Sequence, residues 1–173
     1  MTRLLIATLV ALGLFAAAGI GNGASAALDL RQVIVGHLDA LNRGDVSAAM
    51  AYYADDAESV GTASCMPVCK KAGIEADVRR GLANKPTFTV VSLRETQTGM
   101  GYGKAEVRSE AFRTCGVNRA VLSFTTILVG EKIYRETVDF DVRDGDTAKL
   151  VACLAASMAP RMMPPHTGDG TEG

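Results

Sequence analysis

The chain has 173 residues, and its 18 lysines and arginines nearly balance 19 acidic residues, which gives a formal net charge of −1. No basic cluster is present, so nothing in the sequence would attract nucleic acid or an anionic membrane surface, and both are excluded as partners. An N-terminal leader, described next, takes up the start of the chain. The residues that follow it are enough for one ordinary domain.

The first 26 residues have the three parts of a secretory signal peptide. Arg3 supplies the positive charge, residues 4–20 form an apolar run, and Ala24-Ser25-Ala26 matches an A-x-A cleavage site. The alternative is a membrane anchor, but the run is short for a span and no basic residues follow it. The sequence predicts cleavage, a mature chain from Ala27, and a secreted or periplasmic location without membrane contact.

Helical periodicity dominates the start of the mature chain. Apolar residues at helical spacing predict a helix over residues 28–43 and a second over 46–53, which Asp45 caps. A short strand over residues 58–62 and a third helix over 72–82 follow.

The second half of the chain changes to strand-like periodicity, with short turns between β-rich runs. These runs lie at residues 87–97, 103–113, 119–129 and 132–142. Consecutive hairpins make an antiparallel meander, and the preceding helices must cover one face of it. Residues 155–173 lack periodicity and are predicted to be a flexible tail, which leaves one α+β domain over residues 27–154.

Four cysteines remain in the mature chain: Cys65, Cys69, Cys115 and Cys153. In an oxidising compartment an even number favours disulfides, and four cysteines allow three pairings. The short loop between Cys65 and Cys69 makes this pair the favoured one. The chain has 2 histidines, so zinc is not expected, and no metal site is predicted.

Two segments resemble a known superfamily. Residues 38–61, LDALNRGDVSAAMAYYADDAESVG, resemble the opening of nuclear transport factor 2-like proteins, and RSEAFRTCGVNRAVLSFTTILVGEKI resembles the sheet of their SnoaL-like branch. The resemblance covers residues 28–152 and implies a cystatin-like cone, in which a curved antiparallel sheet wraps around three N-terminal helices with a pocket at the open end. The superfamily includes cyclases, isomerases, dehydratases, epoxide hydrolases and non-catalytic binders, so the fold does not fix the function.

Strand parity indicates which side chains face the inside of this cone. In the last strand Val138, Phe140 and Val142 share the apolar face, which turns toward the core. Tyr134 and Glu136 have the same parity and are expected inside as well. The predicted ligand pocket is lined by Tyr53, Tyr134, Glu136, Val138, Phe112 and Phe124.

The sequence does not decide which face of the second long strand turns inward, because Phe112 favours one face and Val107 favours the other. The text Arg108-Ser109-Glu110 resembles the Arg-x-Asp that limonene-1,2-epoxide hydrolases carry inside their pocket. The resemblance implies that Arg108 holds Glu110 ionised, and that Glu110 acts as a general base. The alternative is an exposed ion pair on the outer face of the sheet.

The likeness to enzymes of the superfamily is incomplete. The second acid of those hydrolases aligns with Val138, which cannot give a proton to an epoxide oxygen. Glu136 has the same parity and could replace that acid, but it lies at a different height in the cone. The catalytic Asp of ketosteroid isomerases falls at Gly61. We therefore expect neither epoxide hydrolysis nor that type of isomerisation.

His37 interrupts the apolar stripe of the first helix, whose inner face closes the cone. A neutral imidazole at this place can donate a hydrogen bond to a ligand carbonyl or act as a general base. The alternative is a core histidine with a satisfied hydrogen bond. The candidate catalytic residues are thus Glu110, Arg108 and His37.

The functional prediction is a small hydrophobic molecule bound in an internal pocket, with acid–base catalysis that needs no cofactor. No phosphate loop, nucleophile motif or dinucleotide fingerprint is present in the sequence. The alternative is a non-catalytic ligand carrier or a dimeric interaction module. The resemblance implies a homodimer through the outer face of the sheet, where Thr125, Ile127 and Val129 have outward parity.

Overall fold

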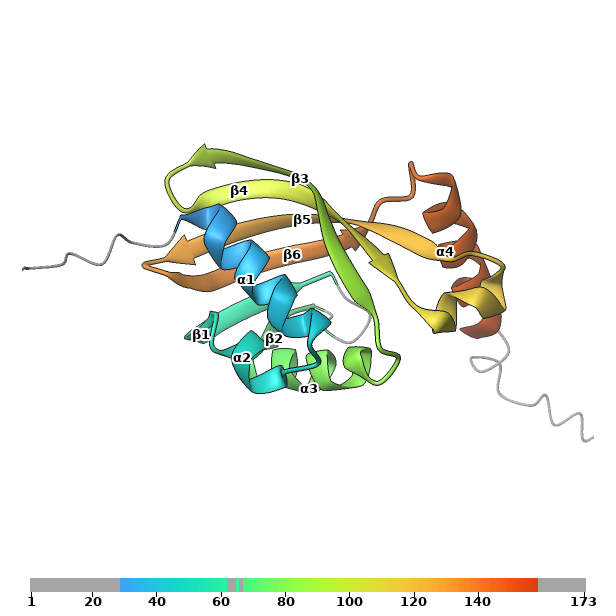
Figure 1. Cartoon of the computed structure of the whole chain (residues 1–173), viewed down its shortest axis with the longest axis horizontal. Coiled ribbons are helices and arrows are strands. Elements are labelled where there is room, and N and C mark those ends of the chain that lie inside the picture. Colours follow the sequence, from blue (N-terminus) through green and yellow to red (C-terminus); the bar gives the residue numbers. More distant parts are fainter. Residues whose placement is uncertain (1–28, 62–64, 66, 159–173) are drawn as a thin grey trace, which may run out of the picture.

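The computed structural model of the chain (Figure 1) describes residues 29–61, 65 and 67–158, so the predicted signal peptide lies outside the described residues. The helices are α1 (Leu30–Asn42), α2 (Val46–Met50), α3 (Lys71–Leu82), the 3-10 helix η1 (Glu110–Cys115) and α4 (Gly145–Met158). The strands are β1 (Tyr53–Val60), β2 (Cys69–Lys70), β3 (Thr87–Gln97), β4 (Met100–Arg108), β5 (Arg119–Val129) and β6 (Lys132–Phe140).

Among the described residues, six strands form one curved sheet in the order β2-β1-β6-β5-β4-β3. Strands β3 to β6 form the predicted antiparallel meander, and β1 joins β6 in parallel. Helix α1 crosses the concave face and α3 lies beside it, near β1 (Figure 1). This curved sheet around N-terminal helices confirms the predicted α+β fold class.

The first strand begins earlier than predicted. Helix α2 ends at Met50 and β1 already starts at Tyr53, where the sequence predicted helix to continue. The physical reason is pairing with β6, because the backbone N–H of Ile133 donates to Tyr52 O at 2.8 Å. Tyr53 therefore belongs to a strand and points into the core.

The second long strand ends earlier than predicted, at Arg108, and η1 follows it. Ser109 ends the strand by capping η1, since its hydroxyl accepts a hydrogen bond from the backbone N–H of Ala111 at 3.3 Å. Within β4 the odd-numbered residues face inward, which resolves the ambiguity in favour of Val107. At Gly103 a β-carbon would clash with the backbone oxygen of Ser92 on β3 and with the Phe124 ring, so glycine is needed there for both to approach β4.

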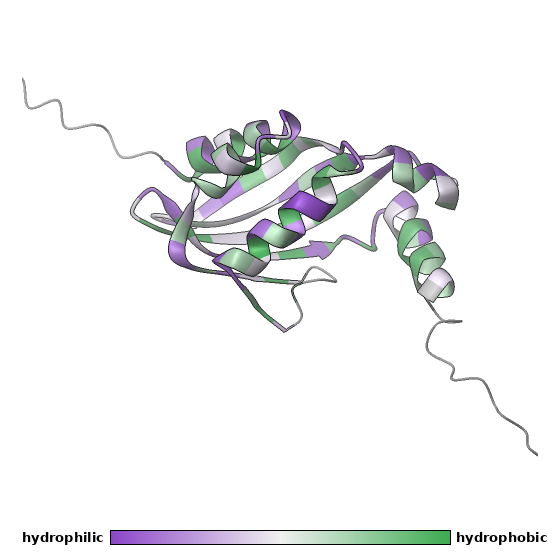
Figure 2. Ribbon diagram, turned by 90° about the horizontal axis from the view of Figure 1, so that it is seen from below, coloured by the Kyte–Doolittle hydropathy of each residue, from purple (hydrophilic) through white to green (hydrophobic). Residues whose placement is uncertain are grey.

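Helix α4 was not predicted. It lies at the end of the sheet opposite the β3–β4 and β5–β6 turns and is hydrophobic along much of its length (Figures 1 and 2). Its buried Leu150 packs with Val107, Val117 and Ala120. Residues 155–158 are helical, so the predicted tail is wrong there, and residues 159–173 lie outside the described residues.

Two disulfides lie within the described residues. Cys65 pairs with Cys69, as predicted, across a Cα–Cα distance of 4.8 Å. Cys115 pairs with Cys153 across 5.7 Å and ties η1 to α4. No helix in the described part of the chain is long and apolar enough to cross a membrane.

Candidate functional site

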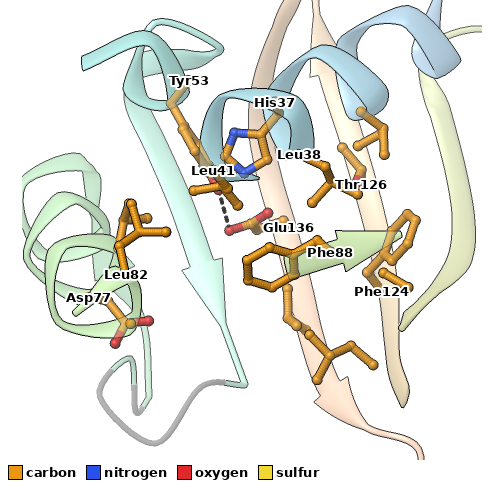
Figure 3. A pocket seen from close by; sticks show the side chains of 16 residues that line it. His37, Leu38, Leu41, Tyr53, Asp77, Leu82, Phe88, Phe124, Thr126 and Glu136 are labelled. Carbon is orange, nitrogen blue, oxygen red and sulfur yellow. Dashed lines mark hydrogen bonds between the residues drawn. The ribbon is translucent and has the colours of Figure 1, made fainter. Parts of the chain in front are cut away.

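A cavity of about 200 Å³ lies between α1, α3 and the concave face of the sheet (Figure 3). Most of its lining is aliphatic or aromatic, and its apolar members include Ile34, Leu38, Leu41, Val78, Leu82, Phe88, Leu122, Phe124 and Val138. Its polar members are His37, Tyr53, Asp77, Thr126 and Glu136. An apolar pocket with a few converging polar groups is the usual form of a small-molecule site.

The sheet register places a row of polar residues on the inner face. Thr126 on β5 and Ser59 on β1 are the cross-strand partners of Glu136 on β6. Thr126 lines the cavity, is 1% exposed, and has no hydrogen-bond partner for its hydroxyl among the described residues. A buried hydroxyl without a partner is uncommon and indicates a place that a ligand or water satisfies.

Glu136 is held by Tyr53. The Tyr53 hydroxyl donates to Glu136 Oε1 at 2.6 Å, and both side chains line the cavity (Figure 3). Burial and the neighbouring Glu136 carboxylate raise the pKa of Tyr53 well above its usual value. Tyr53 therefore remains a neutral donor, and one oxygen of Glu136 is left to act on a bound molecule.

His37 on α1 is a buried, neutral imidazole. Its Nδ1 lies 3.2 Å from Ala49 O, which requires the proton on Nδ1 and leaves the Nε2 lone pair available. Figure 3 shows the ring above Glu136. Burial lowers the pKa of His37, although the Glu136 charge and the bond to Ala49 raise it. At neutral pH His37 thus accepts hydrogen bonds and carries no charge.

The lowered pKa of His37 predicts a pH-dependent stability. The unfolded chain binds a proton near the usual pKa of 6.5, whereas the folded chain binds it only at lower pH, so acid favours unfolding. We expect the unfolding free energy to fall below about pH 6.5, by about 1.4 kcal/mol for each unit of pKa lowering. Urea unfolding between neutral pH and about pH 5 measures this slope. His37→Gln should remove it, and an equal slope in the variant would contradict the account.

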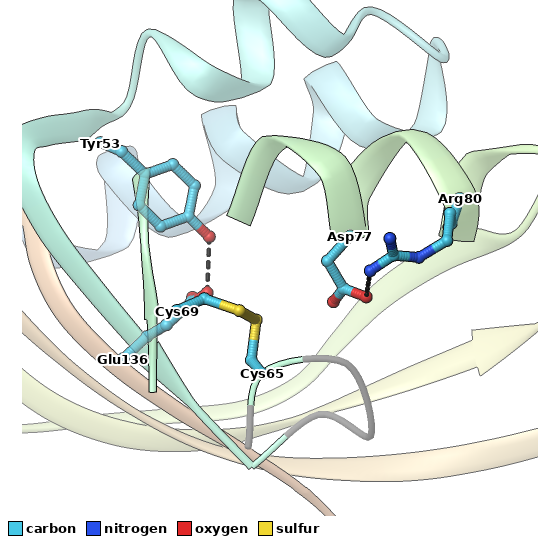
Figure 4. The surroundings of a disulfide bond; sticks show 6 residues. All are labelled: Tyr53, Cys65, Cys69, Asp77, Arg80 and Glu136. Carbon is cyan, nitrogen blue, oxygen red and sulfur yellow. Dashed lines mark hydrogen bonds and ion pairs between the residues drawn. A yellow bond between two sulfur atoms is a disulfide. The ribbon is translucent and has the colours of Figure 1, made fainter. Parts of the chain in front are cut away.

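Asp77 lies on the α3 side of the cavity. It forms an ion pair with Arg80 at 3.4 Å, and their side chains are 26% and 61% exposed. Gly81, one turn later, lines the cavity and is exposed, so the cavity reaches the surface beside α3. The Cys65–Cys69 disulfide lies close to Asp77, Tyr53 and Glu136 (Figure 4).

The expected inward direction of Arg108 and Glu110 is wrong. Arg108 is exposed at the end of β4 and pairs with Glu106 at 2.7 Å, while Glu110 lies in η1 and pairs with Arg113 at 3.0 Å. The Glu110 side chain is 74% exposed, and neither residue lines the cavity. Because the strand ends before Ser109, the parity argument does not extend to Glu110, and this pair has no place in the site.

Phe112 and Tyr134 do not line the cavity either. Phe112 follows the end of β4 and packs in the cluster around Leu150. Tyr134 is displaced by a β-bulge, since Leu128 pairs with Ile133 whereas Ile127 pairs with Arg135. The bulge exchanges the two faces of β6, so that Ile133 and Glu136 both point inward.

The other predicted pocket residues, Tyr53, Glu136, Val138 and Phe124, lie on the cavity wall together with His37. That they bind a ligand stays a prediction. Sequence reasoning missed Thr126 and Asp77, although the parity of Phe124 also applies to Thr126.

On the outer face of β5, Thr125 and Val129 are exposed and Ile127 is half-buried, in line with their parity. A homodimer through this face stays a prediction. Among the described residues, no group of His, Cys, Asp and Glu side chains could hold a metal ion.

No protein-family model matches the chain, and no curated protein matches it. The chain is, however, similar in fold to several solved structures. IdmH, a proposed polyketide cyclase from Streptomyces antibioticus, is 16% identical with a TM-score of 0.58, over 72% of this chain and 97% of that one. An NTF2-like protein of unknown function from Cytophaga hutchinsonii is 17% identical with a TM-score of 0.52, over 65% and 90%.

A proposed ketosteroid isomerase from Kribbella flavida is 15% identical with a TM-score of 0.52, over 64% of this chain and 76% of that one. At these identities the likeness is one of architecture, and function has to be argued from the site. The resemblance drawn from the sequence is confirmed at this level: the chain has the nuclear transport factor 2-like, or cystatin-like, fold.

Proposed function

We propose that this protein is exported, binds a small and mainly apolar molecule in the cavity, and removes a proton from it with Glu136, without a cofactor. The observation that carries the proposal is the Glu136 carboxylate, oriented by Tyr53 at 2.6 Å and placed beside the unpaired hydroxyl of Thr126. A positioned carboxylate in an apolar, partly closed site is a suitable general base.

The groups next to Glu136 can hold a substrate in position beside this base. Thr126 and Glu136 are direct cross-strand partners, so their side chains are about 5 Å apart at Cβ. A carbonyl oxygen of the ligand can accept a hydrogen bond from Thr126 while Glu136 takes a proton from the adjacent carbon. The electron pair of the broken C–H bond then moves to the oxygen, where Thr126 stabilises the charge.

His37 assists as a second acceptor. Its neutral Nε2 faces the same space and can accept a hydrogen bond from a ligand hydroxyl. Two solved structures with this fold are described as a proposed ketosteroid isomerase and a proposed polyketide cyclase, so an enzyme is compatible with this architecture. The isomerase base aligns with Gly61, so in this chain Glu136 would supply the base from another strand.

Export is supported by the leader sequence and by the cysteines. Residues 1–26 carry the charge, apolar run and A-x-A site of a signal peptide. All 4 cysteines of the chain are paired in disulfides, as is usual for proteins that fold in an oxidising compartment.

Proton exchange tests the proposed chemistry without knowledge of the natural product. A panel of cyclic ketones of the steroid and terpene classes is first screened by thermal shift. Ketones that bind are then incubated with the protein in deuterated water, and NMR follows the loss of their α-proton signals. We expect exchange above the rate in buffer. Ketones that bind without any accelerated exchange would contradict catalysis and leave a ligand carrier.

A further inference from the structure

The cavity wall keeps three polar groups for a bound molecule once its internal hydrogen bonds are formed. Glu136 uses one carboxylate oxygen for the Tyr53 hydroxyl, so its second oxygen remains. Nδ1 of His37 is bonded to Ala49 O, so the Nε2 lone pair remains. The buried Thr126 hydroxyl has no hydrogen-bond partner among the described residues and can donate. The bound molecule therefore meets one donor and two acceptors.

The two acceptors are held next to each other by Tyr53. The His37 ring meets the Tyr53 ring edge-on, with centroids 5.2 Å apart, and the hydroxyl of the same tyrosine binds Glu136. The Glu136 charge reaches the imidazole, since it opposes the lowering of the His37 pKa by burial. Thr126 is the cross-strand partner of Glu136 on β5. The donor and both acceptors therefore face one part of the cavity (Figure 3).

A plain ketone matches this set of groups only in part. Its oxygen can accept a hydrogen bond from Thr126, but the ketone has no donor for His37, and a buried acceptor without a donor is costly. A hydroxyl on the carbon next to the carbonyl supplies that donor. The hydrogen on this same carbon is acidic, and it is the one that Glu136 can take.

A hydroxyl one carbon further along would favour a different reaction, the loss of water. That reaction needs a general acid beside the leaving oxygen. Neither Tyr53 nor His37 can serve, because the tyrosine proton is bound to Glu136 and the imidazole proton to Ala49 O. The position of the hydroxyl is thus restricted to the carbon next to the carbonyl.

From this pattern we propose that the substrate is an α-hydroxy ketone on an apolar skeleton, and that the site exchanges the positions of its carbonyl and hydroxyl groups. The inference rests on the proposed function and names the substrate class and the product. No cofactor or second substrate is needed, because the product is an isomer of the substrate.

The reaction begins at the carbon that carries the hydroxyl. Glu136 takes the proton of its C–H bond, the electron pair forms a C=C bond, and the carbonyl π pair moves to the oxygen that Thr126 contacts. His37 accepts the hydroxyl proton and passes it to that oxygen. The oxygen left without a proton forms the new carbonyl, and the electron pair of the C=C bond takes the proton back from Glu136 at the former carbonyl carbon.

Three tetralones with one bicyclic skeleton isolate the effect of the hydroxyl proton. We would compare 1-hydroxy-2-tetralone, 1-methoxy-2-tetralone and 2-tetralone by NMR titration, because only the first can donate a hydrogen bond to His37. It is expected to bind about tenfold more tightly than the other two. The same spectra should show its conversion into 2-hydroxy-1-tetralone above the rate in buffer, since the new carbonyl is conjugated with the aromatic ring.

Two variants separate the roles of the polar groups. His37→Phe keeps a ring against Tyr53 but removes the acceptor, so the hydroxy-to-methoxy affinity ratio should fall close to one. Thr126→Val should weaken both ketones alike and keep the ratio, because both carbonyl groups use the same donor. Thr125→Val, on the exposed outer face of β5, is the matched control and should leave both affinities at their wild-type values.

The comparison in the wild-type protein decides the proposal even where a variant does not fold. Equal affinities for the hydroxy and methoxy ketones, no binding by any of the three, or deuterium uptake by 1-hydroxy-2-tetralone without the transposed isomer would overturn it. The cyclic ketones that test the proposed function need no hydroxyl group. Proton exchange in them would survive each of these results, so the two proposals fail separately.

Discussion

Replacing Glu136 with glutamine is expected to slow α-proton exchange in a bound ketone by about 10²–10⁴-fold, the usual contribution of a positioned general base. Glutamine keeps the size of the side chain and can still contact Tyr53, but its amide cannot take a proton at neutral pH. The ketone should continue to bind, because the apolar lining supplies most of the contact area. Rates from NMR, divided by the bound fraction, give the comparison.

The matched control is Glu58→Gln. Glu58 is also a strand glutamate, on β1, but it pairs with Lys70 at 2.6 Å and is absent from the cavity wall. Its replacement should leave exchange at the wild-type rate. If Glu136→Gln exchanged a bound ketone as fast as wild type, Glu136 would not be the base.

Removal of the Cys115–Cys153 disulfide is expected to lower the unfolding free energy by about 4 kcal/mol. The bond joins residues 38 positions apart, and the loss of loop-closure entropy in the unfolded chain grows with this separation. It also fixes α4 to η1 over the cluster that contains Leu150. Urea unfolding of the Cys115→Ser, Cys153→Ser double variant measures the effect.

The Cys65–Cys69 bond provides the comparison. It spans a separation of 4, so the same relation predicts a loss of about 2 kcal/mol in the Cys65→Ser, Cys69→Ser variant. A larger loss from this pair than from Cys115–Cys153 would show that α4 is not stabilised in the way described.

Elements with a strong internal period could be predicted from the sequence. Strands β3 and β5 cover the predicted residues 87–97 and 119–129, because alternating side chains and turn residues mark both ends. The apolar stripe of α1 likewise placed His37 against the cavity. These elements supply His37 and Phe124. Glu136 and Val138 on β6 were also found, because both lie beyond the bulge at Tyr134 and keep the same parity there.

Errors arose where a local interaction interrupts the period. Ser109 caps η1 and removes Glu110 from the strand, and a bulge at Tyr134 exchanges the faces of β6. Parity is a local rule, so a single cap or bulge invalidates it for every residue beyond.

Helix α4 was not predicted for another reason. Its start is marked by Asp144, whose carboxylate accepts a hydrogen bond from the backbone N–H of Thr147 at 3.0 Å. That capping signal is visible in the sequence, but the Met- and Pro-rich segment that follows the helix has no helical periodicity, and the last residues of the helix, 155–158, were assigned to the same tail. Asp77 was missed because its helix carries charged residues around much of its circumference.

Intermolecular NOEs test the central claim most directly, because neighbouring threonines on β5 face opposite sides of the sheet. Thr126 lines the cavity, whereas Thr125 is exposed on the outer face. A ketone that binds should give NOEs to the methyl group of Thr126 and none to that of Thr125. NOEs to Thr125 alone would place the ligand on the outer surface and contradict the cavity as the functional site.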